Sequence, residues 1–402
     1  MRLKSSRSQS SRSSSVSCND AHQCMPNTCG LPRSPARGRE EPKCGFFHES
    51  TSCMGRRQFL QKLAVVTTSG LVLEMPTDAR GRGLRQVKRS SSWVVPFGKT
   101  DLKVSRLCQG TAFRKNKREA DDPNAQRVLR ACLDLGINFF DSSNAYGWGG
   151  SELALGRALA GRRSEVVVCT KVHPGLKPVG SNPAQRVPFT RAFAQSELEG
   201  SLRRLRTEYV DLYLMHNPDE LTPLEEIFET MQALVQSGKV RYWGVSNHSP
   251  EQVARFVELG KQGGHAIAGI QNYYNLIQRE LEGKMFPLLR ENELGLMPYS
   301  PLDEGRLLEP LSAVSDAGRR ALLSSVDEAA RQCSATRAQV LIAWVLSHPE
   351  ATCALAGAET PEHIKENLGA LDLVLPPEVL SRLNAASNEY LQQRSKQAGK
   401  SG

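Results

Sequence analysis

Short apolar runs alternate with amphipathic segments from residue 93 to residue 390. Each run has the length of a buried strand, and each segment after it has the apolar spacing of a helix that covers one face of a sheet. The predicted strands lie at residues 107–112, 137–143, 165–172, 210–216, 240–247, 267–275, 294–302 and 352–358. The predicted helices lie at residues 121–136, 151–161, 190–205, 222–239, 249–260, 284–292, 319–332, 336–347 and 360–371.

This alternation predicts a parallel sheet, because a helix after each strand returns the chain to the same edge. The 310 residues from position 93 onward suit a single (β/α)₈ barrel, which takes about 250 residues before insertions. A doubly wound sheet would bring a glycine-rich phosphate loop. The nearest match has Gly147 and Gly149 but then Glu152, so it lacks the third glycine of that loop. We therefore expect a (β/α)₈ domain over residues 93–390.

The positive charge of the chain belongs to its N-terminal region. The whole chain has a formal net charge of +10, and residues 1–92 hold 16 basic and 6 acidic residues, which accounts for all of it. The body of the chain is neutral, so it lacks the electrostatic pattern of a nucleic-acid-binding protein. No nucleic-acid partner is expected.

The N-terminal region is predicted to contain two parts. Residues 1–53 are rich in Ser, Arg, Pro and Cys without apolar periodicity, which is typical of disorder. Residues 54–80 contain paired arginines, Arg56 and Arg57, before an apolar stretch from Leu63 to Leu73, and resemble a twin-arginine export signal. That stretch is too short to span a bilayer. We expect an exported, periplasmic protein.

Other interpretations of this region stay open. The true start could be Met54, with residues 1–53 a mis-assigned upstream extension. The segment could instead be a basic linker with a short apolar patch, which would leave the protein in the cytoplasm. Its Ser/Arg-rich, acid-poor beginning also fits an organellar transit peptide.

Cysteine and histidine spacings give no sign of a metal site. The cysteines of the N-terminal region show no CxxC pair, and the chain has no HExxH motif. The five cysteines of the body lie in apolar stretches and are expected to be small buried residues: Cys108, Cys132, Cys169, Cys333 and Cys353.

Four polar residues are predicted at the C-terminal ends of consecutive strands, where a (β/α)₈ barrel places its active site. Asp141 ends the second strand and Tyr146 follows it, Lys171 ends the third and His216 the fourth. A lysine cation held by the aspartate would favour the phenolate and improve the tyrosine as a proton donor. The histidine would orient a carbonyl or relay a proton. This set suits protonation of an alkoxide, as in carbonyl reduction by hydride.

The motifs "DSSNAYG", "TKV", "LMHNPD", "GVSN", "QNYYN" and "YSPLDEG" follow in this order at the ends of predicted strands two to seven. Together they resemble the aldo-keto reductases, and in particular the branch with potassium-channel β-subunits and bacterial stress reductases. The resemblance covers about residues 94–385. It implies a barrel that binds an extended nicotinamide dinucleotide and an NAD(P)H-dependent reduction of an aldehyde or ketone. It leaves the substrate and the oligomeric state open.

The resemblance also assigns roles to residues. Tyr146 matches the catalytic acid of the family, and Lys171, Asp141 and His216 complete its tetrad. Positions that match its cofactor contacts are Ser246, Asn247 and Gln271 at the carboxamide, Tyr299 on the nicotinamide ring, Ser300, Leu302 and Gly305 at the pyrophosphate, and Gly357, Ala358, Thr360, His363, Glu366 and Asn367 at the adenosine end.

Two features bear on cofactor and substrate choice. Glu359 stands where many relatives carry a serine, so a carboxylate replaces a group that helps to hold the 2′-phosphate of NADPH. NADPH remains the expected cofactor, with NADH use possible because of Glu359. Trp148, on the glycine-flanked loop after Tyr146, is either a wall of the substrate pocket or a packing anchor. An alternative function is a redox-sensing regulatory subunit that binds the cofactor and turns over little.

Overall fold

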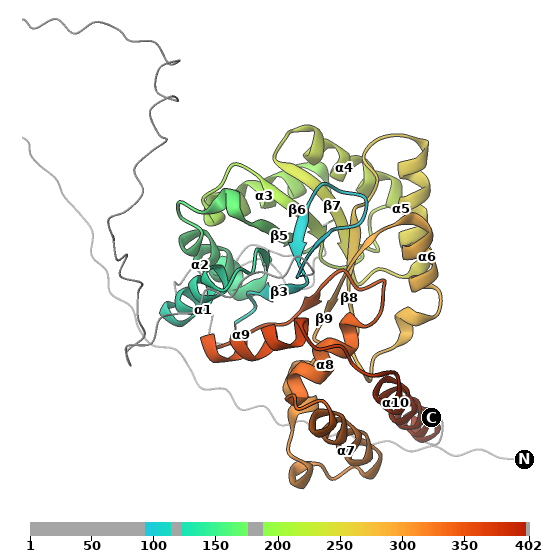
Figure 1. The fold of residues 1–402 in the computed structure, drawn as a ribbon. Helices are drawn as coiled ribbons and strands as arrows, with labels where there is room; N and C mark the ends of the chain where they lie inside the picture. Colours follow the sequence, from blue (N-terminus) through green and yellow to red (C-terminus); the bar gives the residue numbers. More distant parts are fainter. Residues whose placement is uncertain (1–92, 114–121, 176–187, 399–402) are drawn as a thin grey trace, which may run out of the picture. The chain divides into compact units, whose positions relative to one another are not determined.

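The computed structural model describes residues 93–113, 122–175 and 188–398, and these form a closed barrel of parallel strands surrounded by helices (Figure 1). The strand order around the barrel is β10-β3-β4-β5-β6-β7-β8-β9, so neighbours in sequence are neighbours in space. This confirms the (β/α)₈ prediction. The N-terminal parts predicted at residues 1–53 and 54–80, with the export signal, lie outside the described residues.

The barrel strands are shorter than the apolar runs that predicted them. Their bounds are β3 Leu107–Gly110, β4 Phe139–Asp141, β5 Val167–Val172, β6 Val210–Met215, β7 Val240–Ser246, β8 Gly269–Tyr273, β9 Gly295–Tyr299 and β10 Ala354–Leu355. The helices are α1 Pro123–Asp134, α2 Gly150–Ala158, α3 Arg191–Leu205, α4 Leu224–Gln236, α5 Pro250–Gln262, α6 Met285–Asn292, α7 Ala317–Gln332, α8 Arg337–Leu346, α9 Pro361–Leu368 and α10 Pro377–Ala398.

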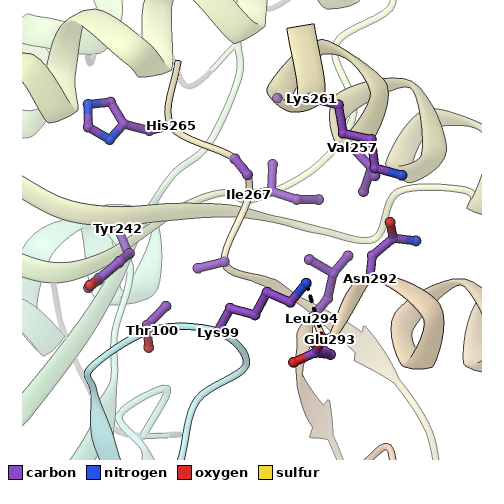
Figure 2. Close-up of a pocket in the computed structure, with 13 residues that line it drawn as sticks. Lys99, Thr100, Tyr242, Val257, Lys261, His265, Ile267, Asn292, Glu293 and Leu294 are labelled. Atoms are coloured by element: carbon purple, nitrogen blue, oxygen red, sulfur yellow. Dashed lines mark ion pairs between the residues drawn. The ribbon is translucent and has the colours of Figure 1, made fainter. Parts of the chain in front are cut away.

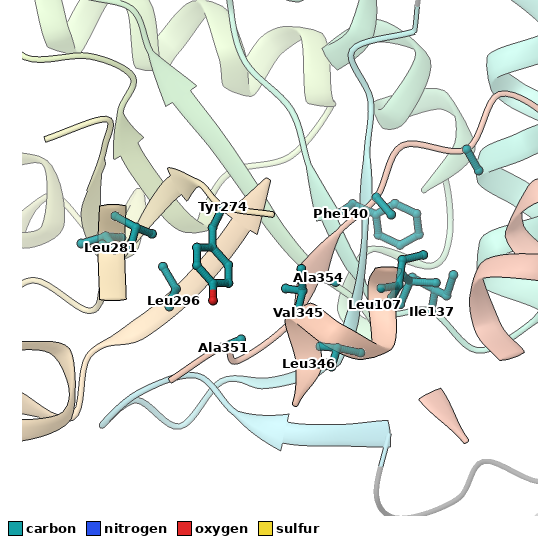
Figure 3. Close-up of a cluster of buried hydrophobic side chains, with 14 of the residues drawn as sticks. Leu107, Ile137, Phe140, Tyr274, Leu281, Leu296, Val345, Leu346, Ala351 and Ala354 are labelled. Carbon is teal, nitrogen blue, oxygen red and sulfur yellow. The ribbon is translucent and has the colours of Figure 1, made fainter. Parts of the chain in front are cut away.

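Both faces of most barrel strands are buried. Every residue of β5 and β6 is buried, because one face looks into the barrel and the other packs on helices. Figure 3 shows part of the outer layer, where side chains of β3, β4 and β9 such as Leu107, Phe140 and Leu296 lie in one buried cluster with Val345 of α8. A separate cluster that includes Phe139, Cys169 and Leu212 fills the interior. The barrel is therefore a packed core rather than a channel.

An antiparallel hairpin that the sequence pattern did not predict precedes the barrel. It consists of β1 Val94–Pro96 and β2 Lys103–Ser105. Phe97, at its turn, is fully buried and belongs to the interior cluster. Its ring lies so close to Gly295, the first residue of β9, that a Cβ atom there would approach the ring to 2.7 Å. The hairpin turn thus closes the barrel at the N-terminal ends of its strands.

The C-terminal helix α10 was also not predicted, and it packs against α7 (Figure 1). Among the cysteines of the body, four are buried as expected, but Cys333 at the end of α7 is only half-buried. It follows the last turn of the helix, where one side faces solvent. No helix within the described ranges is both long and apolar enough to cross a membrane.

Candidate active site

A cavity of about 720 Å³ lies at the C-terminal end of the barrel. The last residues of four strands line it: Gly110, Ser246, Tyr299 and Leu355. The predicted residues that line it are Tyr146, His216, Ser246, Asn247, Gln271, Tyr299, Ser300, Leu302, Gly305, Gly357, Ala358 and His363. The structure therefore brings most of the candidate site together around one hollow.

Asp141 and Lys171 lie beneath this cavity, where Lys171 contacts Tyr146 of its wall and Asp141 contacts Gln271. The Lys171 Nζ atom lies 2.7 Å from Asp141 Oδ2 and donates hydrogen bonds to Tyr146 Oη at 3.1 Å and to the Ser142 carbonyl at 2.8 Å. Gln271 Nε2 donates to the other carboxylate oxygen of Asp141 at 2.8 Å. Both carboxylate oxygens are thus occupied, and the lysine is aimed at the phenol.

Burial and neighbouring charges have opposite effects on the pKa values of Lys171 and Tyr146. Burial acts to lower the pKa of Lys171, but the negative charge of Asp141 and the groups around it outweigh burial and raise the pKa, so the lysine stays a cation. Burial raises the pKa of Tyr146, and Lys171 opposes this rise. The effect of the lysine has the predicted direction, yet burial is the larger cause and the net pKa of the phenol is raised. Tyr146 is therefore a neutral phenol that holds its proton.

His216 follows the last residue of β6 and is a neutral base. Burial, the Lys171 cation and the neighbouring His173 lower its pKa to about 3. Its ring meets that of Tyr146 edge to face at a centroid distance of 5.5 Å and that of His173 at 5.4 Å. Its Nδ1 atom lies 3.1 Å from Ser143 Oγ. Neither Ser143 nor His173 was predicted, because each lies beside a candidate residue without a signal of its own.

The turn that carries Tyr146 is held from beneath. Gly149 has a φ of 95°, and a Cβ atom there would approach Arg204 Cδ to 2.6 Å. Arg204 in turn binds Glu152, which is fully buried, at 2.7 Å. Trp148, with a φ of 53°, is 51% exposed and does not line the cavity. This glycine-rich loop is therefore a left-handed turn held against Arg204 of α3.

A chain of hydrogen bonds runs along one wall of the cavity. Tyr299 Oη donates to Asn247 Oδ1 at 2.9 Å, and Asn247 Nδ2 donates to Asn217 Oδ1 at 3.0 Å. Asn217 Nδ2 lies 3.1 Å from His173 Nε2, and His173 Nδ1 lies 2.8 Å from the Pro174 carbonyl. Each amide is fixed by its neighbours in this chain, which holds Asn247 and Tyr299 in place.

Two side-chain oxygens of the cavity wall are suited to bind a polar group. Ser246 Oγ is buried and has no hydrogen-bond partner among the described residues. Gln271 is buried, and because its Nε2 atom binds Asp141, its carbonyl oxygen is left for another donor. Buried polar groups usually have partners, so Ser246 Oγ, together with the Gln271 carbonyl oxygen, fits the amide group of a bound molecule.

The loop after β9 lines the cavity and is held by several hydrogen bonds. Asp303, Glu304 and Gly305 all have positive φ values. Arg306 donates to both carboxylate oxygens of Asp303 at 2.9 Å, and Tyr273 hydrogen-bonds the same carboxylate. The Tyr273 ring stacks on Tyr299 at 5.2 Å. The sequence prediction included Gly305 but missed the three side chains that fix the loop, since their contacts join two strand ends.

Three residues predicted at the adenosine end do not line the cavity. Thr360 caps α9, its hydroxyl accepting from the His363 backbone at 3.3 Å. Asn367 is buried, and Glu366 accepts from Gln339 through its backbone carbonyl at 3.0 Å. Glu359 does line the cavity.

A second hollow of about 320 Å³ lies at the N-terminal ends of β8 and β9 (Figure 2). Ile267 and Leu294 line it, and Lys99 of the hairpin turn pairs with Glu293 across it at 3.1 Å. None of the candidate site residues lines it. The larger cavity is therefore the candidate active site.

Comparison with known proteins agrees with this geometry. Residues 106–388 match the profile of the Aldo/keto reductase family. The chain belongs to this family. It is 33% identical over 308 residues to "Uncharacterized oxidoreductase YrpG" of Bacillus subtilis, covering 72% of this chain and 94% of that protein. It is 34% identical over 297 residues to "Methylglyoxal reductase YeaE" of Escherichia coli, covering 71% and 92%.

A third relative has a different name. The chain is 32% identical over 318 residues to "Probable voltage-gated potassium channel subunit beta" of Oryza sativa, covering 72% of this chain and 94% of the relative. The family membership and the relatives named as reductases identify this aldo/keto reductase as an oxidoreductase.

Proposed function

We propose that this aldo/keto reductase converts an aldehyde or ketone to an alcohol with NADPH or NADH, and that Tyr146 donates the proton. The observation that carries the proposal is the contact of Lys171 Nζ with Tyr146 Oη at 3.1 Å, beneath a cavity that His216 also lines. The phenol holds its proton at neutral pH and faces a cation that stabilises the phenolate left after transfer.

The cavity residues fit a nicotinamide cofactor. Ser246 Oγ, which has no hydrogen-bond partner among the described residues, and the Gln271 carbonyl oxygen would hold the carboxamide. The Tyr299 ring would stack on the nicotinamide ring, and the 303–305 loop would cover the pyrophosphate. When bound, the reduced nicotinamide supplies a hydride to the carbonyl carbon. The carbonyl oxygen takes the proton of Tyr146, and Lys171 with Asp141 stabilises the phenolate.

The test uses the full chain with NADPH and then NADH, following loss of cofactor absorbance with small aldehydes. Tyr146→Phe is expected to lower turnover by about 100-fold or more, because the proton donor is lost. Its cofactor affinity should stay close to that of the wild type. Equal turnover in the two proteins would rule out the role of Tyr146.

A second candidate is a redox-sensing subunit, favoured by the similarity to the probable channel β-subunit of rice. Such a protein would hold its cofactor and release it slowly. Tight binding of reduced cofactor without steady-state release of the oxidised form, for every carbonyl compound tried, would favour this candidate over the enzyme.

Export through a twin-arginine signal at residues 54–80 remains part of the proposal. The paired arginines before an apolar stretch support it. Because that route carries folded proteins, the enzyme would be exported with its cofactor bound. It would then need a way to recycle the cofactor in the periplasm. Fractionation of cells that express the tagged full chain tests this point, and recovery wholly in the cytosol would refute it.

A further inference from the structure

The ring of His216 has a single hydrogen-bond partner among the described residues, the hydroxyl of Ser143 at 3.1 Å from Nδ1. Ser143 is fully buried on the segment after β4, whereas His216 lines the cavity after β6. A neutral imidazole carries its hydrogen on one nitrogen only, and the partner of one nitrogen decides which. Ser143 is thus in a position to set the tautomer of His216.

The neighbours of Ser143 restrict where its own hydrogen goes. Ser143 Oγ accepts from the Ala145 backbone N–H at 3.1 Å, so it has one hydrogen to donate. Asn144 Oδ1 is within reach of this hydrogen at 3.3 Å, but it already accepts from the His173 backbone N–H. The orientation of Asn144 is fixed because its Nδ2 atom donates to Glu197 at 2.7 Å. His216 Nδ1, at 3.1 Å, is the nearer of the two candidate acceptors for this hydrogen.

We propose that Ser143 is a positioning residue that donates to His216 Nδ1 and so places the ring hydrogen of His216 on Nε2, for donation to the substrate. This inference rests on the proposed function for its chemical meaning. In carbonyl reduction, the Nε2–H group and the Tyr146 hydroxyl would both donate to the carbonyl oxygen, where negative charge develops. The other tautomer would present a lone pair to that oxygen and repel it.

The test reads the tautomer directly. The full-length protein is labelled with ¹⁵N-histidine, and long-range ¹H–¹⁵N correlations of His216 are recorded at neutral pH without cofactor. In the wild type, Nδ1 should have the shift of an acceptor nitrogen and Nε2 that of a protonated nitrogen. Ser143→Ala should move the two shifts toward each other, and Ser143→Thr, which keeps the hydroxyl, should restore the wild-type pattern.

Ser142→Ala is the matched control. Ser142 is the neighbouring buried serine, and its hydroxyl accepts from Thr111 at 2.9 Å rather than contacting His216. Its spectrum should keep the His216 pattern of the wild type. A wild-type ring protonated at Nδ1, or identical His216 shifts in wild type and Ser143→Ala, would overturn the proposal.

Kinetics separate this inference from the proposed function. Ser143→Ala should lower kcat by about tenfold, less than the 100-fold or more expected on removing a donor outright, with unchanged affinity for NADPH. A changed tautomer with an unchanged kcat would refute the positioning role. The predicted shifts in a protein that reduces no carbonyl compound would leave the tautomer assignment standing and refute the proposed function instead.

Discussion

Lys171 and Asp141 form an ion pair with an Nζ–Oδ2 distance of 2.7 Å whose side chains are 0% and 1% exposed. They come from adjacent strands, β5 and β4, and Asp141 is the last residue of its strand. A charge buried this deeply is stable only while its partner is present. The pair therefore matters for folding as well as for the chemistry.

Asp141→Asn should destabilise the protein strongly, because it leaves the Lys171 cation without a counter-charge. Breaking a buried pair costs about 3–5 kcal/mol, and the loss should appear in urea denaturation. Asp134→Asn is the control, since Asp134 pairs with Arg162 at 3.2 Å on the surface with its side chain 73% exposed. Its effect should stay within about 1 kcal/mol. Similar losses in both variants would contradict this account of the buried pair.

Gly149→Ala should reduce turnover by disturbing the turn that carries Tyr146. The new methyl group would collide with Arg204, which Glu152 holds in place. Gly161→Ala is a matched control, because Gly161 also has a positive φ, of 77°, but a Cβ atom there meets nothing within 4 Å. Both variants should lose about 1–2 kcal/mol of stability from backbone strain. If they lose equal activity, the contact with Arg204 does not position Tyr146.

Glu359→Arg should strengthen NADPH binding relative to NADH. Glu359 lines the end of the cavity where the 2′-phosphate of NADPH is expected, and its carboxylate would repel that phosphate. An arginine would pair with it, so the ratio of the two dissociation constants should move toward NADPH by about tenfold or more. Fluorescence titration with both cofactors measures this ratio. An unchanged ratio would show that Glu359 does not set cofactor preference.

Stability should fall on the acid side of pH 6.5 because two histidines are held neutral. Burial lowers the pKa of His216 to about 3 and that of His248 to about 4. As the pH falls, these histidines take up protons in the unfolded chain before they do so in the folded chain. Their contribution to the free energy of unfolding is therefore complete above the unfolded pKa of about 6.5 and is lost as the pH falls toward 4.

His248→Gln isolates the second of these contributions. It should reduce the loss of unfolding free energy between pH 6.5 and pH 4 by up to about 3 kcal/mol. Urea denaturation of wild type and variant across this range measures the difference. Parallel curves would show that His248 titrates alike in the folded and unfolded chain.

The order of strands and helices followed from apolar spacing, because long, regular segments determine the barrel. The hairpin β1–β2 has strands of three residues each, too short for a periodic signal. The predicted eighth strand, residues 352–358, is reduced to Ala354–Leu355, since the residues after it leave the sheet to line the cavity.

Part of the site was also predictable, for a different reason. Asp141, Tyr146, Lys171 and His216 stand at or beside strand ends, so topology alone brings them together. Contacts such as Ser143 with His216 depend on side-chain orientations, which residue order does not determine. Burial likewise depends on the finished fold, and it reversed the expected direction for the pKa of Tyr146.

The hairpin turn around Phe97 has a consequence for how substrate enters the barrel and how product leaves it. It seals one end of the barrel against Gly295, and the interior cluster fills the space between that end and the cavity. Within the described residues, a substrate would enter at the C-terminal end of the barrel, and its product would leave at the same end. Of two molecules that share this cavity, the one that lies deeper would have to bind first and leave last, so the order of binding would depend on a turn at the far end of the barrel.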